Sequence, residues 1–126
     1  MTTDRLRDYF DHMIEATRLA CSYVEGMGKD DFLGDKRTQQ AVILNIIVIG
    51  EVASKLLAEH SAFLANHPEV AWRNMKGMRN RIAHGYFDIN MEIVWDTVCA
   101  ALPALVTQIS SIRQSLPSGN DFNREQ

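Results

Sequence analysis

Apolar residues recur every three or four positions along most of the chain, which is the spacing of helices that bury one face. The first stretch, residues 4–25, ends before the segment Gly26–Gly28, and glycine commonly ends helices. Its apolar side is formed by Leu6, Phe10, Met13, Thr17, Ala20 and Val24. The pattern predicts a helix over residues 4–25.

The second stretch, residues 36–59, is apolar on almost every side between residues 41 and 50. A strand is the alternative for so short an apolar run, but the helical period continues before and after it. Such a helix lies at the centre of a protein or is covered by a second subunit. Gly50 costs about 1 kcal/mol relative to alanine inside a helix, so we expect it to let another helix approach closely.

Two more helices are predicted towards the C-terminus. One covers residues 70–84 and ends at Gly85, which we expect to adopt the left-handed conformation. The other is capped by Asp88 or Asn90, and Pro103 is expected to bend or interrupt it. Its apolar side is formed by Ile93, Val94, Val98, Leu102, Leu105, Ile109 and Ile112.

Segments 30–35 and 61–68 are predicted as connections, and residues 117–126 as a flexible polar tail. The expected fold is all-α, an antiparallel bundle of four to five helices that occupies residues 1–116 as one domain. A chain of 126 residues with 46% hydrophobic and 23% charged residues agrees with a single soluble domain.

The net charge of −3 argues against a nucleic-acid partner until its distribution is considered. Arg73, Lys76, Arg79 and Arg81 lie within nine residues that contain no acid, and the rest of the chain has 9 basic and 16 acidic residues. A local basic patch attracts phosphate, whereas an acidic remainder discourages indiscriminate binding. The alternative is that these charges only solvate a helix face.

The N-terminal residues lead directly into an amphipathic pattern without the features of a secretory signal peptide. The most apolar run, residues 41–50, is shorter than the roughly 20 residues that span a bilayer. We therefore expect a cytoplasmic protein with no membrane partner.

The basic helix ends in the run Arg79-Asn80-Arg81-Ile82-Ala83-His84-Gly85-Tyr86. On a regular helix, Arg79 and His84 are about 140° apart. They converge only if the helix ends before His84, and Gly85 supplies a reason for such an end. Tyr86 then follows on an extended stretch and points to the same side as His84. We expect these three side chains to face one cleft.

RNA cleavage by the neighbouring 2′-hydroxyl suits this set. Histidine titrates near neutral pH and serves as a general base or acid, and the guanidinium of Arg79 holds two phosphate oxygens. We expect no metal ion and no cofactor. The four histidines are not spaced, relative to one another or to acidic residues, as metal ligands usually are. The histidines are His12, His60, His67 and His84.

Structural roles are the alternative for each residue of the motif. His84 would bond the last carbonyls of its helix, the arginines would pair with carboxylates, and Tyr86 would lie at the edge of the core. Glu51, at the end of the apolar run, is either partly buried against a basic residue of the motif helix or faces solvent. We assign Glu51 no catalytic role.

The residues around the motif resemble the HepT family, a branch of the HEPN superfamily. The family pattern is a tryptophan, a Gly-Met-Arg-Asn run, a His-x-Tyr, an aspartate and a later tryptophan. The matching positions are Trp72, Gly77-Met78-Arg79-Asn80, His84-Gly85-Tyr86, Asp88 and Trp95. Ala41-Val42 and Ile49-Gly50-Glu51 also look like the second helix of this family, and the resemblance extends from the first helix to Leu102-Pro103.

The resemblance implies a HEPN-like homodimer and the toxin of a bacterial toxin–antitoxin pair that cleaves RNA without metal. Arg79 and His84 are the implied catalytic residues, with Asn80 in support. The implied partner is a minimal nucleotidyltransferase, the MntA-like antitoxin, which silences the toxin by adding AMP to the tyrosine two residues past the histidine, here Tyr86. The new phosphate would compete for the arginine that the RNA requires.

Three functions are therefore considered. The first is a metal-independent endoribonuclease toxin in which Arg73, Lys76 and Arg81 help bind the RNA substrate. A two-fold interface that joins both His84 side chains would supply it with one base and one acid. The second is a non-catalytic nucleotide- or RNA-binding subunit of a nucleotidyltransferase, and the third is an interaction protein whose basic helix docks on an acidic partner.

Overall fold

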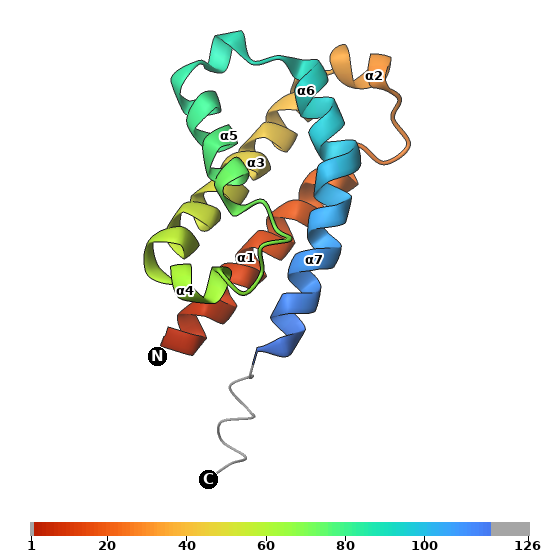
Figure 1. The fold of residues 1–126 in the computed structure, drawn as a ribbon. Coiled ribbons are helices and arrows are strands. Elements are labelled where there is room, and N and C mark those ends of the chain that lie inside the picture. The colour runs from red at the N-terminus through yellow and green to blue at the C-terminus, as the bar shows by residue number, and fades with distance from the viewer. Residues whose placement is uncertain (1, 117–126) are drawn as a thin grey trace.

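The computed structural model describes residues 2–116, with side chains from Arg5 onwards, and every regular element in this part is helical (Figure 1). The longer helices are α1 (Thr2–Tyr23), α3 (Lys36–Glu59), α5 (Trp72–His84) and α7 (Leu102–Ser115). The shorter elements are α2 (Lys29–Leu33), α4 (Ser61–Leu64), the 3₁₀ turn η1 (Tyr86–Asp88), α6 (Met91–Asp96) and the π-helical turn η2 (Thr97–Ala101). The predicted all-α bundle is confirmed, and the expected tail at residues 117–126 lies outside the described residues.

The bundle is built around α1 and α3, which pack along each other. Helix α7 covers α1, and α5 covers α3 (Figure 1). Large side chains from α1, α3 and α7 meet in the interior and are almost completely buried, among them Phe10, Met13, Ile49, Leu56 and Ile109. The packing of α5 on α3 is what positions the motif segment.

The expected connections contain two short helices that sequence periodicity did not detect. In α2, the Gly28 backbone N–H donates to the Asp31 carboxylate at 2.9 Å, which closes the first turn. Phe32 is fully buried, and its ring centroid lies 5.4 Å from that of Trp95 in α6. Helices of four or five residues are too short to show a 3.6-residue period, so only their buried apolar residues hint at them.

The C-terminal helix is continuous from Met91 to Ser115. It accommodates Pro103 because the preceding turn, η2, is wider than an α-helical turn. The Leu102 N–H bonds the Thr97 carbonyl five residues back, which is π-helical geometry. A proline ring clashes with the carbonyl four residues before it in an α-helix, and a wider turn relieves that clash. Asn90 caps this helix, since its side chain accepts the N–H groups of Glu92 and Ile93.

The apolar run at residues 41–50 is by itself too short to span a membrane. Helix α3 as a whole is longer than that run, so the length of the run does not exclude a membrane-spanning helix here. Over an 18-residue window, α3 has a mean hydropathy of 2.0, which by length and composition alone is enough to cross a membrane. The continuous helix Met91–Ser115 passes the same criterion. Half of the α3 window is buried inside the bundle, as in the central helix of many folded domains.

Candidate functional site

Helices α3 and α5 touch at Gly50, and this contact fixes Arg79. A Cβ atom at position 50 would lie 2.7 Å from the carbonyl oxygen of Met75 and would overlap the Cβ of Arg79. Glycine is therefore required for this approach, as the sequence predicted. The stem of Arg79 lies directly on the backbone of α3.

The guanidinium of Arg79 reaches the surface beside Glu51. Its Nη1 lies 3.5 Å from Oε2 of Glu51, and the two side chains are 25% and 51% exposed. The Nε of Arg79 is buried and has no hydrogen-bond partner in the described part of the chain. Glu51 therefore faces solvent, which was one of the two alternatives, and it also pairs with a basic residue of the motif helix, which was part of the other. An ion pair this exposed contributes at most about 1 kcal/mol.

His84 is the last residue of α5, which confirms the predicted C-terminal end of this helix, so the earlier end that convergence of Arg79 and His84 requires does not occur. Gly85 is also not left-handed, since its φ is −148°. Its N–H bonds the carbonyl of Arg81, and its carbonyl accepts the N–H of Asp88 at 2.9 Å. The chain passes directly from α5 into η1, and this path requires no left-handed residue.

Because α5 is helical through His84, Arg79 and His84 leave it about 140° apart. The predicted convergence of these two side chains within one chain therefore does not occur. Arg79 faces α3, whereas His84 is exposed to solvent. Convergence would require α5 to end before His84. The backbone bonds at Gly85 instead keep the chain helical through His84.

His84 instead shares the outer side of α5 with polar and basic residues. Arg73 and Asn80 lie eleven and four residues before it, which places all three within about 40° around the helix axis. Arg81 is exposed on the adjacent part of this side, with its Nη1 close to Gly77. Lys76 is half-buried between this outer side and α3. Four of the six predicted site residues on α5 therefore lie on one outward surface.

The turn η1 carries two aromatic rings beyond His84. Tyr86 is 41% exposed and Phe87 is 98% exposed, and their rings meet edge to face with centroids 5.7 Å apart. Tyr86 is thus accessible from solvent. Phe87 was missed by the sequence analysis, where an apolar residue outside any helical stripe was its only signal.

A groove of about 450 Å³ lies next to η1, between α5 and α6. Ile82, Ile89 and Val94 line its apolar part, and Arg81 and Asp88 line its polar edge. Among the side chains that the structure describes, no three histidine, cysteine, aspartate or glutamate residues are grouped so that they could hold a metal ion.

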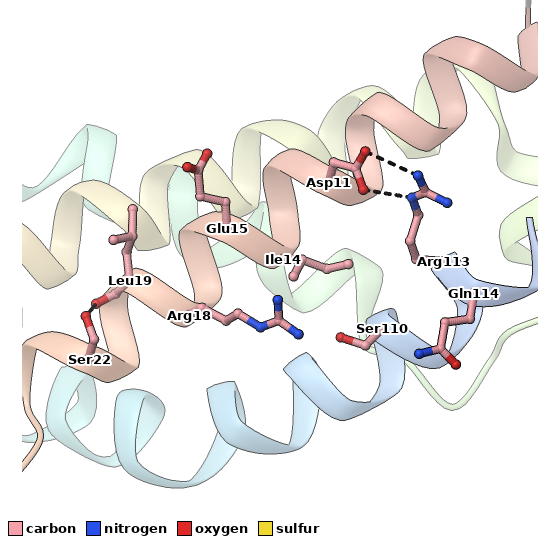
Figure 2. Close-up of a pocket in the computed structure, with 9 residues that line it drawn as sticks. All are labelled: Asp11, Ile14, Glu15, Arg18, Leu19, Ser22, Ser110, Arg113 and Gln114. Atoms are coloured by element: carbon pink, nitrogen blue, oxygen red, sulfur yellow. Dashed lines mark hydrogen bonds and ion pairs between the residues drawn. The ribbon is translucent and has the colours of Figure 1, made fainter. Parts of the chain in front are cut away.

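A second groove, of about 600 Å³, runs between α1 and α7, away from the motif (Figure 2). Arg113 of α7 forms a two-pronged ion pair with Asp11 of α1, with N–O distances of 2.7 and 3.4 Å. Arg18 extends from α1 towards Ser110 in the same groove. None of the predicted site residues lines this groove.

Comparison with known proteins places the motif in context. A family model described as "Ribonuclease HepT-like" matches residues 13–112. A "Putative RNase" of Methanocaldococcus jannaschii is 34% identical over 118 residues, which is 94% of each chain. A "Probable ribonuclease HepT" of Thermococcus cleftensis is 33% identical over 108 residues, or 86% of this chain and 96% of that protein. No solved structure matches the chain.

Proposed function

This chain belongs to the HepT-like ribonuclease family, and from this premise we propose that it is the toxin of a bacterial toxin–antitoxin pair. Its activity is metal-independent endonucleolytic cleavage of RNA in the cytoplasm. The observation that carries the proposal is the position of His84, exposed at the end of α5 on the same side as Arg73 and Asn80. A solvent-exposed imidazole on the same side of a helix as cationic and amide side chains is suited to a phosphodiester substrate.

The proposed chemistry is an internal transfer at phosphorus. The 2′-hydroxyl oxygen attacks the adjacent phosphorus while its proton passes to a base, and the bond from phosphorus to the 5′-oxygen breaks as that oxygen gains a proton. The products carry a 2′,3′-cyclic phosphate and a free 5′-hydroxyl. His84 moves these protons, the Arg79 guanidinium binds the non-bridging oxygens, and Asn80 supports the phosphate.

We propose that the protein acts as a homodimer, and the positions of Arg79 and His84 support this. Arg79 and His84 leave α5 on different sides, so a single chain does not present them to one phosphate. In the proposed dimer a second copy supplies the missing group, and it packs on the exposed apolar side of α3, where Leu44 is 60% exposed with Ile47 and Val48 beside it. Glu51, and with it Arg79, adjoins this surface. Two-fold symmetry then places the basic segments of both chains in one cleft.

Replacing Leu44 with arginine should convert the dimer to a monomer and lower RNA cleavage at least tenfold. The substitution places a charge at the centre of the apolar contact, where it has no partner. Multi-angle light scattering gives the mass, and a fluorescent RNA assay gives the rate. Leu33→Arg, in α2 and also exposed, is the matched control and should stay dimeric. A fully active wild-type monomer would contradict the dimer proposal.

The nuclease proposal is tested with purified wild-type protein and total RNA in excess EDTA. Cleavage should persist in EDTA and should stop at a position where a single 2′-deoxynucleotide replaces the ribonucleotide. The products should carry the cyclic phosphate. An inert wild type, or activity that EDTA removes, would contradict the proposal.

Control by a nucleotidyltransferase is proposed to act on Tyr86. This phenol is exposed two residues past His84, so an attached AMP would carry its phosphate into the basic surface of α5. Mass spectrometry of protein made together with its transferase should find AMP on Tyr86 and should find the modified protein inactive. Tyr23, which is 40% exposed on α1, is the internal control and should remain unmodified.

A non-catalytic role is the second candidate, and the separation of Arg79 from His84 on α5 favours it. In that case the chain binds RNA or a nucleotide for a partner transferase, and Arg79 is a phosphate anchor only. Arg79→Ala would then weaken binding of a labelled RNA, while the EDTA assay would find no cleavage by any variant.

A further inference from the structure

Phe87 is the most exposed large apolar side chain among the described residues. It is 98% exposed, whereas Leu44, the next in order, is 60% exposed. Its single ring contact is the edge-to-face contact with Tyr86. A phenylalanine held in solvent next to a basic surface is a feature that packing within the chain does not explain.

The backbone around Phe87 is fixed on both sides. The Asp88 N–H bonds the carbonyl of Gly85 at 2.9 Å, and the Ile89 N–H bonds the carbonyl of Tyr86 at 3.3 Å. Ile89 then packs against the core, and Asn90 caps the next helix. The ring is therefore presented by an ordered turn between two anchored helices and needs little ordering when it binds a flat partner.

The charges near the ring determine which part of a ligand it meets. The cations Arg81 and Arg73 lie along α5, whereas Asp88 follows Phe87 directly and is exposed. Phosphates are therefore attracted to α5 and repelled from the tip of η1. A strand whose phosphates follow α5 would have to place a base, rather than a phosphate, on Phe87.

On the premise of the proposed function, we propose that Phe87 is a stacking platform for a nucleobase of single-stranded RNA next to the scissile phosphate. Stacking of bases on aromatic side chains, combined with cations that follow the backbone, is how proteins hold single strands with little sequence preference. The contact requires an unpaired base, so it directs the enzyme to loops and single-stranded regions. Phe87 is a positioning residue in this scheme and takes no part in proton transfer.

Binding is measured by fluorescence anisotropy with a labelled single-stranded RNA of twelve nucleotides, in the non-cleaving full-length His84→Ala protein. Adding Phe87→Ala should raise the Kd about ten- to a hundredfold. Phe87→Trp should keep the affinity, and its fluorescence should be quenched when the RNA is added. Leu33→Ala, an exposed apolar side chain on α2, is the matched control and should leave the Kd unchanged. The loss should be absent for double-stranded RNA.

An unchanged Kd in Phe87→Ala would overturn the inference, as would a parent protein that binds no RNA. If the Kd is unchanged but Phe87→Ala alters the mass in light scattering, the ring belongs to a protein contact and the inference is also wrong. Cleavage by wild type is scored separately. A wild type that binds RNA but never cleaves it contradicts the nuclease proposal, while the Kd of Phe87→Ala still decides the role of the ring.

Discussion

RNA cleavage should fall by at least a hundredfold when His84 is replaced with alanine. General acid–base catalysis by a positioned side chain contributes about 10²- to 10⁴-fold, and His84 is the single histidine of the motif. The side chain is exposed at the end of α5, and the described part of the chain shows no hydrogen bond to its imidazole. Surface substitutions of this kind change the free energy of unfolding by no more than about 0.5 kcal/mol.

The measurement is the initial rate of cleavage of a fluorescent RNA in EDTA, together with the thermal unfolding midpoint of each protein. His67→Ala is the matched control, because His67 lies between α4 and α5, outside the motif and away from the proposed dimer surface on α3. It should cleave at the wild-type rate. A His84→Ala protein that cleaves as fast as wild type would rule out the proposed role of this imidazole, and one that fails to fold would make His84 a structural residue.

Gly50→Ala should lower the free energy of unfolding by about 2 kcal/mol, and Gly50→Val by more. Alanine is normally favoured over glycine inside a helix by about 1 kcal/mol, but overpacking typically costs about 1–3 kcal/mol and occasionally more. Overpacking dominates here because the added methyl meets the Met75 carbonyl at 2.7 Å and overlaps the Cβ of Arg79. Neither of these atoms can move unless α5 separates from α3.

Gly77→Ala is the matched control for this prediction. Gly77 lies inside α5, and a Cβ there would meet only Nη1 of Arg81, at 3.6 Å. That substitution should raise the free energy of unfolding by about 0.5–1 kcal/mol. Urea denaturation followed by circular dichroism measures both variants. If Gly50→Ala proves as stable as wild type, the close approach of the two helices at this point is incorrect.

Local signals predicted much of the fold. The bounds of α3 agree with the prediction at both ends, because its apolar residues follow one period without interruption. The close helix contact at Gly50 was also predicted, since a glycine within a continuous helix needs a reason outside the helix. Asn90 as a cap depends only on neighbouring backbone groups, so the sequence could indicate it as well.

The remaining features depend on contacts that the sequence does not encode locally. Gly85 is a common helix stop, but which backbone conformation it adopts was decided by the turn η1 that follows it. The direction of Arg79 was set by the packing of α5 on α3, which the spacing of the motif could not specify. Phe87 differs from a buried phenylalanine only in what surrounds it, so its exposure required the structure.

The exposed ion pair of Arg79 and Glu51 affects which anions Arg79 can bind when no RNA is present. A guanidinium that already has a carboxylate neighbour offers little to chloride or to a small monoanion, since such a ligand must displace Glu51 to gain one contact. A nucleic-acid strand binds through several phosphates at once, and the sum of those contacts outweighs the single weak pair. If Arg79 binds RNA as proposed, Glu51 is a competitor that a polyanion displaces more readily than a small monoanion does.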